Sequence, residues 1–209
     1  MEDSIQVIED GCKCTSAGLK SLMGREIEVC VDDISLMPGC RKFASHILKS
    51  ISLGEDLKDE FLFNYGYYLI KCVYINEKII SFMELLEDGR FCLGVSKAVR
   101  VLEEQISLCK KFDANLSPPS FEQLAVISDG LWEGDAVKGV RYPSPPHMSG
   151  WWLITDRYDG NTKSLKTVHI RHVTYQRPEI TKYISLPFGF RFSSQDDEVW
   201  FDEKVALDR

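Results

Sequence analysis

The chain has 209 residues, of which 44% are hydrophobic and 27% are charged. This composition is that of a globular protein with a substantial core and excludes a disordered chain. Its 32 acids against 25 bases give a net charge of -7, which disfavours nucleic-acid binding because phosphate contacts need clustered Lys and Arg. The same charge suits a basic protein partner.

The cysteines indicate a reducing compartment. There are seven, an odd number, and several lie inside apolar runs such as "IEVCV" and "LIKCVYI", as buried free thiols do. The first residues, "MEDSIQVIEDG", lack the basic and apolar regions of a secretory signal. No apolar stretch approaches the roughly 20 residues that cross a membrane. We therefore expect a cytoplasmic protein without a membrane partner.

The first half is predicted to mix strands and helices. Residues 1–24, with acids and "GCKCTSAG", are predicted to be loosely organised. Alternating apolar residues predict a strand over 25–33, and a repeating apolar face predicts helices over 38–51 and 96–112. Aromatic and β-branched residues predict strands over 61–75 and 78–86, separated by a turn at Asn76 and Glu77.

The segment "DANLSPPS" at 113–120 is the best candidate linker, because its two prolines cannot continue the preceding helix. We therefore predict two domains, 1–118 and 119–209. The second is predicted to contain strands at "QLAVIS", "AVKGVRY", "GWWLITD", "FGFRF" and "EVWFDE" and a short helix starting at Pro178. The run "LKTVHIRHVTY" fits a strand or a helix. Both halves are thus predicted to be α+β, with mainly antiparallel sheets and a few helices packed on them.

Motifs for metal binding or catalysis are weak. Cys12 and Cys14 form C-x-C without a second pair at zinc spacing. His169 and His172 share a face only if they lie on a helix, and His147 and Asp156 could join them only through the fold. We expect no metal and no cofactor.

No G-x-S-x-G, G-x-G-x-x-G or P-loop occurs in the chain. The sequence therefore favours a protein that is not an enzyme. A hydrolase that uses His169 or His172 together with a cysteine stays open as an alternative, since seven cysteines and four histidines offer many combinations. A regulatory module that binds a small ligand between the two halves is a third possibility.

The stretch "RYPSPPHMSGWWLITD" at 141–156 combines three prolines with a Trp-Trp pair. A strand over 150–156 places Trp152 and Ile154 on one face and Trp151 and Leu153 on the other. One ring is then expected in the core, and the other is available as an interface anchor. We predict Trp151 as the anchor.

The segment "SSQDDEVWFDE" at 193–203 gathers acids around two aromatic rings. Such a segment can be an edge strand whose acids prevent pairing with another chain. It can also be a patch that docks a basic protein. We include Asp196, Asp197, Glu198 and Trp200 with Trp151 as candidate partner-binding residues.

The second half resembles a known family over about residues 121–203. Its order is "AVISDGLWEGDAVKGVRYPSPPHMSGWWLI", then "SLKTVHIRHVTYQRPEITKYISLPFGFRFSS". The Ser-Gly-Trp after a strand pair and the closing Pro-x-Gly-x-x-Phe resemble the immunity protein thirty-three family of bacterial polymorphic-toxin systems. The run "RYPSPPHM" and the doubled Trp depart from the family pattern, and residues 1–118 have no counterpart in it.

The resemblance implies an immunity protein that binds a cognate antibacterial toxin and blocks it sterically. The toxin could be basic, such as a nuclease, and could be delivered by contact-dependent or type VI secretion in bacterial competition. The resemblance also gives scaffold roles to Gly150, in a tight turn before a strand, and to Pro187 and Gly189, whose turn delivers Phe190 and Phe192 to the sheet.

Overall fold

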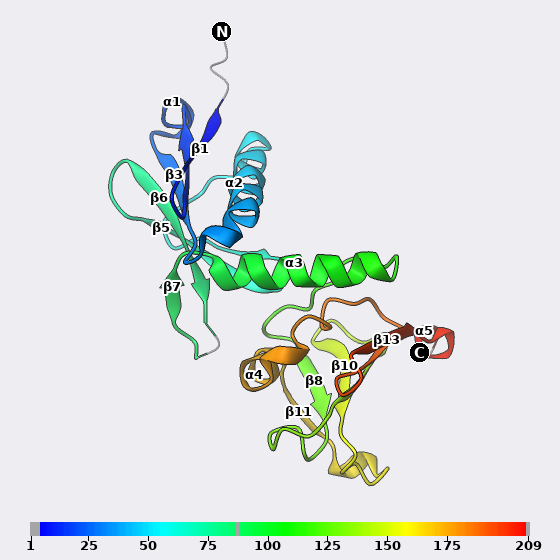
Figure 1. Ribbon diagram of the computed structural model, residues 1–209. Coiled ribbons are helices and arrows are strands. Elements are labelled where there is room, and N and C mark those ends of the chain that lie inside the picture. Colours follow the sequence, from blue (N-terminus) through cyan, green and yellow to red (C-terminus); the bar gives the residue numbers. More distant parts are fainter. Residues whose placement is uncertain (1–4, 87, 208–209) are drawn as a thin grey trace. The chain divides into compact units, whose positions relative to one another are not determined.

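The computed structural model describes residues 5–86 and 88–207 and divides into two compact units, Met1–Glu103 and Glu104–Arg209 (Figure 1). The division falls within helix α3 (Ser96–Lys111), so residues 113–120 lie inside the second unit. The domain limits that we predicted, 1–118 and 119–209, stay a prediction. Each unit combines a mixed sheet with helices, which confirms the predicted α+β class.

The first unit contains a sheet in the order β1-β2-β3-β6-β5-β4, with β7 added to β6. All of its paired strands are antiparallel except β3 and β6. The strands are β1 (Gln6–Asp10), β2 (Lys13–Ala17), β3 (Glu26–Cys30), β4 (Leu62–Tyr65), β5 (Tyr68–Tyr74), β6 (Ile79–Leu85) and β7 (Phe91–Leu93). The helices are α1 (Lys20–Met23), the 3-10 turn η1 (Ile34–Leu36), α2 (Met37–Ser52) and the start of α3.

Helix α2 buries its apolar face in this unit. Phe43 is fully buried and packs edge-on against Phe82 of β6, with ring centroids 5.2 Å apart. Gly39 allows α2 to approach α3 closely, because a Cβ there would lie 2.1 Å from a methyl group of Val99. The two predicted helices are therefore confirmed, and they pack directly on one another.

The N-terminal segment is more ordered than we predicted. Strands β1 and β2 form an antiparallel hairpin that continues into β3. Glu26 of β3 accepts hydrogen bonds from the backbone N–H groups of Gly18, Leu19 and Lys20, which fixes the turn after β2. The prediction of a loosely organised segment was wrong because this hairpin buries small residues such as Cys14, which give little hydrophobic periodicity.

The second unit contains a sheet in the order β11-β8-β10-β9-β12-β13. Its paired strands are antiparallel except β8 and β10. The strands are β8 (Leu124–Ile127), β9 (Lys138–Arg141), β10 (Met148–Ile154), β11 (Lys166–His169), β12 (Phe190–Ser193) and β13 (Glu198–Phe201). The helical elements are η2 (Thr162–Ser164), α4 (Ile170–Gln176), η3 (Pro178–Ile180) and α5 (Glu203–Leu207).

The run "LKTVHIRHVTY", which the sequence left open, is both a strand and a helix. It pairs with β8 as β11 and turns into α4 at the junction of His169 and Ile170. Ile170 and Val173 of α4 are fully buried, so the β-branched residues serve first a sheet edge and then a helix face.

The inner face of this sheet forms the core of the second unit. Leu153 lies between Ile127 of β8 and Gly139 of β9, and Phe192 of β12 lies beyond Gly139. A Cβ on Gly139 would lie 2.0 Å from the Phe192 ring, so glycine is required where that ring crosses the strand. Phe192 stacks on Tyr183 at 4.2 Å between centroids.

Arg141, at the end of β9, is buried in this core with 3% of its surface exposed. Its guanidinium donates to the backbone carbonyls of Ser149, Ser117, Ile184 and Leu186. Burial lowers the pKa of Arg141 to about 10, so the group keeps its charge at neutral pH. Backbone carbonyls therefore solvate the buried cation, and Arg141 connects β9 with β10, residues 113–120 and residues 184–186.

We predict that Arg141→Leu lowers the free energy of unfolding by roughly 3–5 kcal/mol, because it leaves several buried carbonyls without a donor. Arg157→Leu is the control, since that side chain is half-exposed and pairs with Asp135; its loss should stay below about 1 kcal/mol. Urea unfolding followed by circular dichroism measures both values. Equal midpoints for the two variants would contradict the role assigned to Arg141.

Candidate partner-binding face

The outer face of the second unit's sheet presents one continuous row of side chains. Residues directly opposite on neighbouring strands point to the same face. The register places Trp152 of β10 between Val126 of β8 and Val140 of β9. Val140 is opposite Arg191 of β12, which is opposite Trp200 of β13. Two tryptophans therefore lie on one face, three strand spacings apart, or about 14 Å.

The two neighbouring tryptophans have opposite environments. Trp151 is fully buried, donates its indole N–H to the Ile184 carbonyl at 2.9 Å, and packs edge-on against Phe192. Trp152 is half-buried on the outer face and packs edge-on against Tyr142, with ring centroids 5.6 Å apart. The structure thus corrects the choice of Trp151 as an interface anchor, because that ring has no surface to offer. Trp152 is the ring that a partner can reach.

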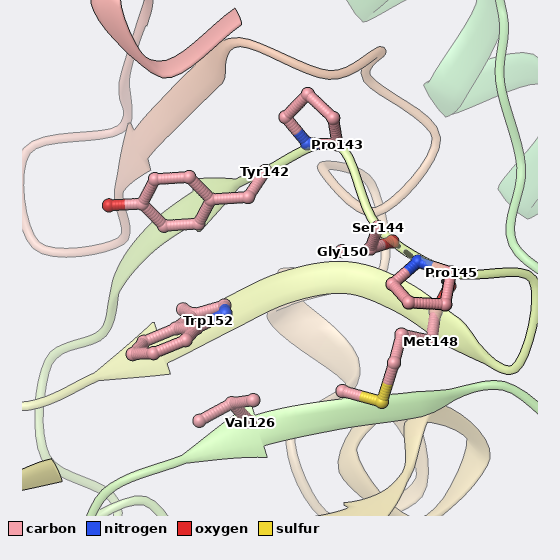
Figure 2. Close-up of a pocket in the computed structure, with 8 residues that line it drawn as sticks. All are labelled: Val126, Tyr142, Pro143, Ser144, Pro145, Met148, Gly150 and Trp152. Carbon is pink, nitrogen blue, oxygen red and sulfur yellow. Dashed lines mark hydrogen bonds between the residues drawn. The ribbon is translucent and has the colours of Figure 1, made fainter. Parts of the chain in front are cut away.

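A pocket of about 430 Å³ opens beside Trp152 on this outer face (Figure 2). Its walls come from β8 and β10 and from the proline-rich loop between β9 and β10. The lining side chains are Val126, Tyr142, Pro143, Pro145, Met148 and Trp152, with Ser144 and Gly150 completing the wall. The volume lies in the lower part of the range of ligand pockets, which are mostly apolar.

Gly150 shapes this pocket. Its φ of +82° is a backbone conformation that other residues rarely adopt. A Cβ at this position would also lie 2.3 Å from the Tyr142 carbonyl oxygen. The resemblance implied a tight turn at Gly150 before the strand, but Gly150 lies within β10, where the register with β8 shifts between Met148 and Trp152. Gly150 also forms part of the pocket wall.

The acidic segment divides into side chains with different roles. Asp197 has a positive φ of 53° and pairs with Lys182 and the Tyr183 hydroxyl, so it closes the turn before β13. Hydrogen bonds from these two groups lower the pKa of Asp197. Asp196 accepts from the Ser193 hydroxyl at 2.8 Å and is otherwise exposed. Glu198 is exposed on the outer face, and Trp200 exposes 41% of its surface.

The histidine pair lies together at the junction of β11 and α4. The rings of His169 and His172 are edge-to-face, 5.7 Å apart. Burial lowers the pKa of His172, and the charges of Arg171 and His169 lower it further. Within residues 5–86 and 88–207, no group of three His, Cys, Asp or Glu side chains could hold a metal ion. Cys14, half of the C-x-C motif, is buried in the first unit.

Sequence reasoning missed the residues that line the pocket. Seven of them lie between Tyr142 and Trp152, inside the stretch 141–156 that the sequence analysis singled out, and Val126 comes from β8. No pattern in the sequence indicated that this stretch lines a pocket. The available signal was the alternation along 150–156, which had already placed Trp152 opposite to Trp151. In the part of the chain that the structure describes, the helices are too short or too polar to cross a membrane.

Comparison with protein families gives a match in the second half of the chain. Residues 104–202 match the Imm33-like domain. The resemblance predicted from residues 121–203 is confirmed, and the match begins earlier, inside helix α3. No curated protein and no solved structure shows a significant match to the chain. The sheet that carries Trp152 and Trp200 thus lies within the matched domain.

We predict that the two tryptophans differ in their contribution to stability. Trp151→Ala should lower the free energy of unfolding by about 3–5 kcal/mol, because it leaves a cavity in the core. Trp152→Ala should cost about 1–2 kcal/mol, since the ring is already partly in water. Urea titrations of the two variants measure both losses. A larger loss for Trp152 than for Trp151 would show that the two faces are assigned wrongly.

Proposed function

We propose that this protein is an immunity protein that binds a cognate antibacterial toxin and blocks it sterically. The Imm33-like domain at 104–202 indicates an immunity protein family. The proposal includes three further points. The toxin is a polymorphic toxin, it is delivered by contact-dependent or type VI secretion, and it is neutralised in the cytoplasm. We also propose that the toxin is basic.

The single observation that supports binding most strongly is the aromatic outer face of the second unit. Trp152, Val140 and Trp200 form a row in which the rings are half-buried or exposed. Tryptophan is enriched among the few residues that dominate protein interfaces. A six-stranded sheet face can supply the roughly 800 Å² that each partner of a standard interface contributes.

Steric inhibition is proposed in preference to catalysis because the candidate catalytic groups are not among the described residues that line the pocket beside Trp152. His169 and His172 are neighbours, but neither lines the pocket beside Trp152. Cys109, the cysteine of the second unit, is buried and directs its thiol to the Ser185 carbonyl. Burial raises the pKa of this thiol, which makes it a poor nucleophile.

The test is co-expression of the full chain with the toxin encoded beside it. We expect the chain to restore growth and to bind the purified toxin in calorimetry. Trp152→Ala and Trp200→Ala should each weaken binding by about 2 kcal/mol, or roughly thirtyfold, as central aromatic anchors do. Cells that die equally fast with and without the protein would exclude the proposal.

Tyr175→Ala is the matched control. Tyr175 is an aromatic residue with 52% of its surface exposed, and it lies on α4, outside the strands that carry Trp152 and Trp200. Its loss should leave the affinity for the toxin unchanged. If Tyr175→Ala weakens binding and the two tryptophan variants do not, the toxin uses the helical side of the unit.

A further inference from the structure

The pocket beside Trp152 has the chemistry of a socket for an apolar side chain. None of the described residues that line it is charged. The Ser144 hydroxyl donates to the Met148 carbonyl, and the Gly150 carbonyl accepts from the Tyr142 N–H, so these polar groups are already used. A phosphate, a sugar or a metal ion would find few partners here, whereas a large apolar group would gain contacts with Tyr142 and Trp152.

The socket is held open by its own loop. Two of its lining residues are prolines, and the Met148 N–H donates to the Pro145 carbonyl at 2.9 Å. Gln123 donates from its side chain to the Pro146 carbonyl, and the Leu124 N–H donates to the His147 carbonyl, which ties the loop to the start of β8. A loop fixed in this way loses little conformational entropy on binding.

The far end of the same face carries unpaired negative charge. Lys138 pairs with Asp156, Arg191 with Asp202, and Lys182 with Asp197. Lys138 also interacts electrostatically with Asp196, and Lys111 with Asp197. No ion pair is found for Asp196 or Glu198 among the described residues, and both are exposed. Glu198 lies on the same face of β13 as Trp200, and Asp196 lies in the turn before that strand. This part of the face therefore favours a cation from a partner.

The strand spacing relates these two features. Trp152 and Trp200 lie in one register row, three strand spacings or about 14 Å apart. In an extended peptide, side chains four residues apart point the same way and lie about 13 Å apart. Glu198 lies two residues before Trp200 on the same face, about 7 Å along β13, so it is about 16 Å from Trp152. One extended segment can therefore place an apolar side chain at Trp152 and, four residues on, a long cationic side chain that extends toward Glu198.

We propose that the partner of this face is a basic polypeptide that inserts one large apolar side chain into the pocket at Trp152 and, about four residues away along an extended segment, directs a Lys or Arg to Asp196 and Glu198. This proposal deepens the proposed function and depends on it only for the identity of the partner as a toxin.

The probe is a blocked pentapeptide, acetyl-Phe-Ser-Thr-Ser-Arg-amide, titrated into the full-length ¹⁵N-labelled protein. The indole N–H signals of Trp152 and Trp200 report the two ends of the face separately. We expect both signals to shift on one binding curve with a dissociation constant of about 1 mM or lower, while the Trp151 signal stays in place.

Two changed peptides separate the two contacts. Replacing Phe by Ala should remove the shift at Trp152 and weaken binding about tenfold, because the apolar contact is lost. Replacing Arg by Glu should weaken binding about fivefold at low salt and much less at high salt, because exposed charges are screened. A salt-independent affinity for the original peptide would exclude the charge contact.

Variants of the protein complete the test. The double variant Asp196→Lys and Glu198→Lys should reverse the preference, so that the Glu peptide binds about fivefold better than the Arg peptide. Tyr175→Ala should change nothing, and the dispersion of each variant's spectrum checks that it is folded. An unchanged peptide preference in the lysine variant would overturn the assignment of these acids.

The outcomes also separate this inference from the proposed function. If the Phe and Ala peptides bind equally, or if the Trp152 signal does not move, the pocket is not an apolar socket, whatever the co-expression experiment shows. If the Phe peptide binds as expected but the chain gives no protection against the toxin, the surface assignment stands and the immunity function fails.

Discussion

The buried guanidinium of Arg141 is the interaction on which the second unit depends. It points to the core from the end of β9 and is solvated by carbonyls of four separate residues. Because side chains alternate along a strand, the inward direction of Arg141 requires Val140 to face outward. The outer row and the burial of Trp151, directly opposite Arg141, thus follow from one charged side chain. An apolar residue there could fill the space but could not satisfy the carbonyls.

Two glycines adapt the backbone to these two faces. Gly139 leaves room for the Phe192 ring on the inner side, and Gly150 allows the proline loop to return close to β9 on the outer side. Each would collide with its neighbour if it carried a Cβ. The core and the pocket therefore lie on opposite faces of one sheet. A side chain at Gly139 would disturb the core, and one at Gly150 would disturb the pocket.

The sequence predicted what local patterns determine and missed what depends on packing. Helices α2 and α3 have strong apolar faces and were predicted within a few residues of their ends. The N-terminal hairpin was missed because its order comes from pairing with β3 and from the Glu26 carboxylate, which lie outside the hairpin. The alternation of Trp151 and Trp152 was predicted, but the choice between them was wrong, since it depends on which face residues 180–186 cover. The pocket depends on how residues 142–152 fold against Val126 of β8, which no local pattern indicates.

In the acidic segment, the number of acids in the sequence is larger than the number that is available to bind a partner. The Asp197 carboxylate is not free to bind a partner, because it accepts hydrogen bonds from Lys182 and Tyr183. Of the candidate acids, Asp196 and Glu198 are left to act on a partner. Exposed charges contribute more to the rate and selectivity of association than to its strength. On the proposed surface, affinity would then come mainly from the rigid apolar socket beside Trp152. The acids would select and orient a basic partner, so charge and apolar contact would perform separate tasks at opposite ends of one sheet face.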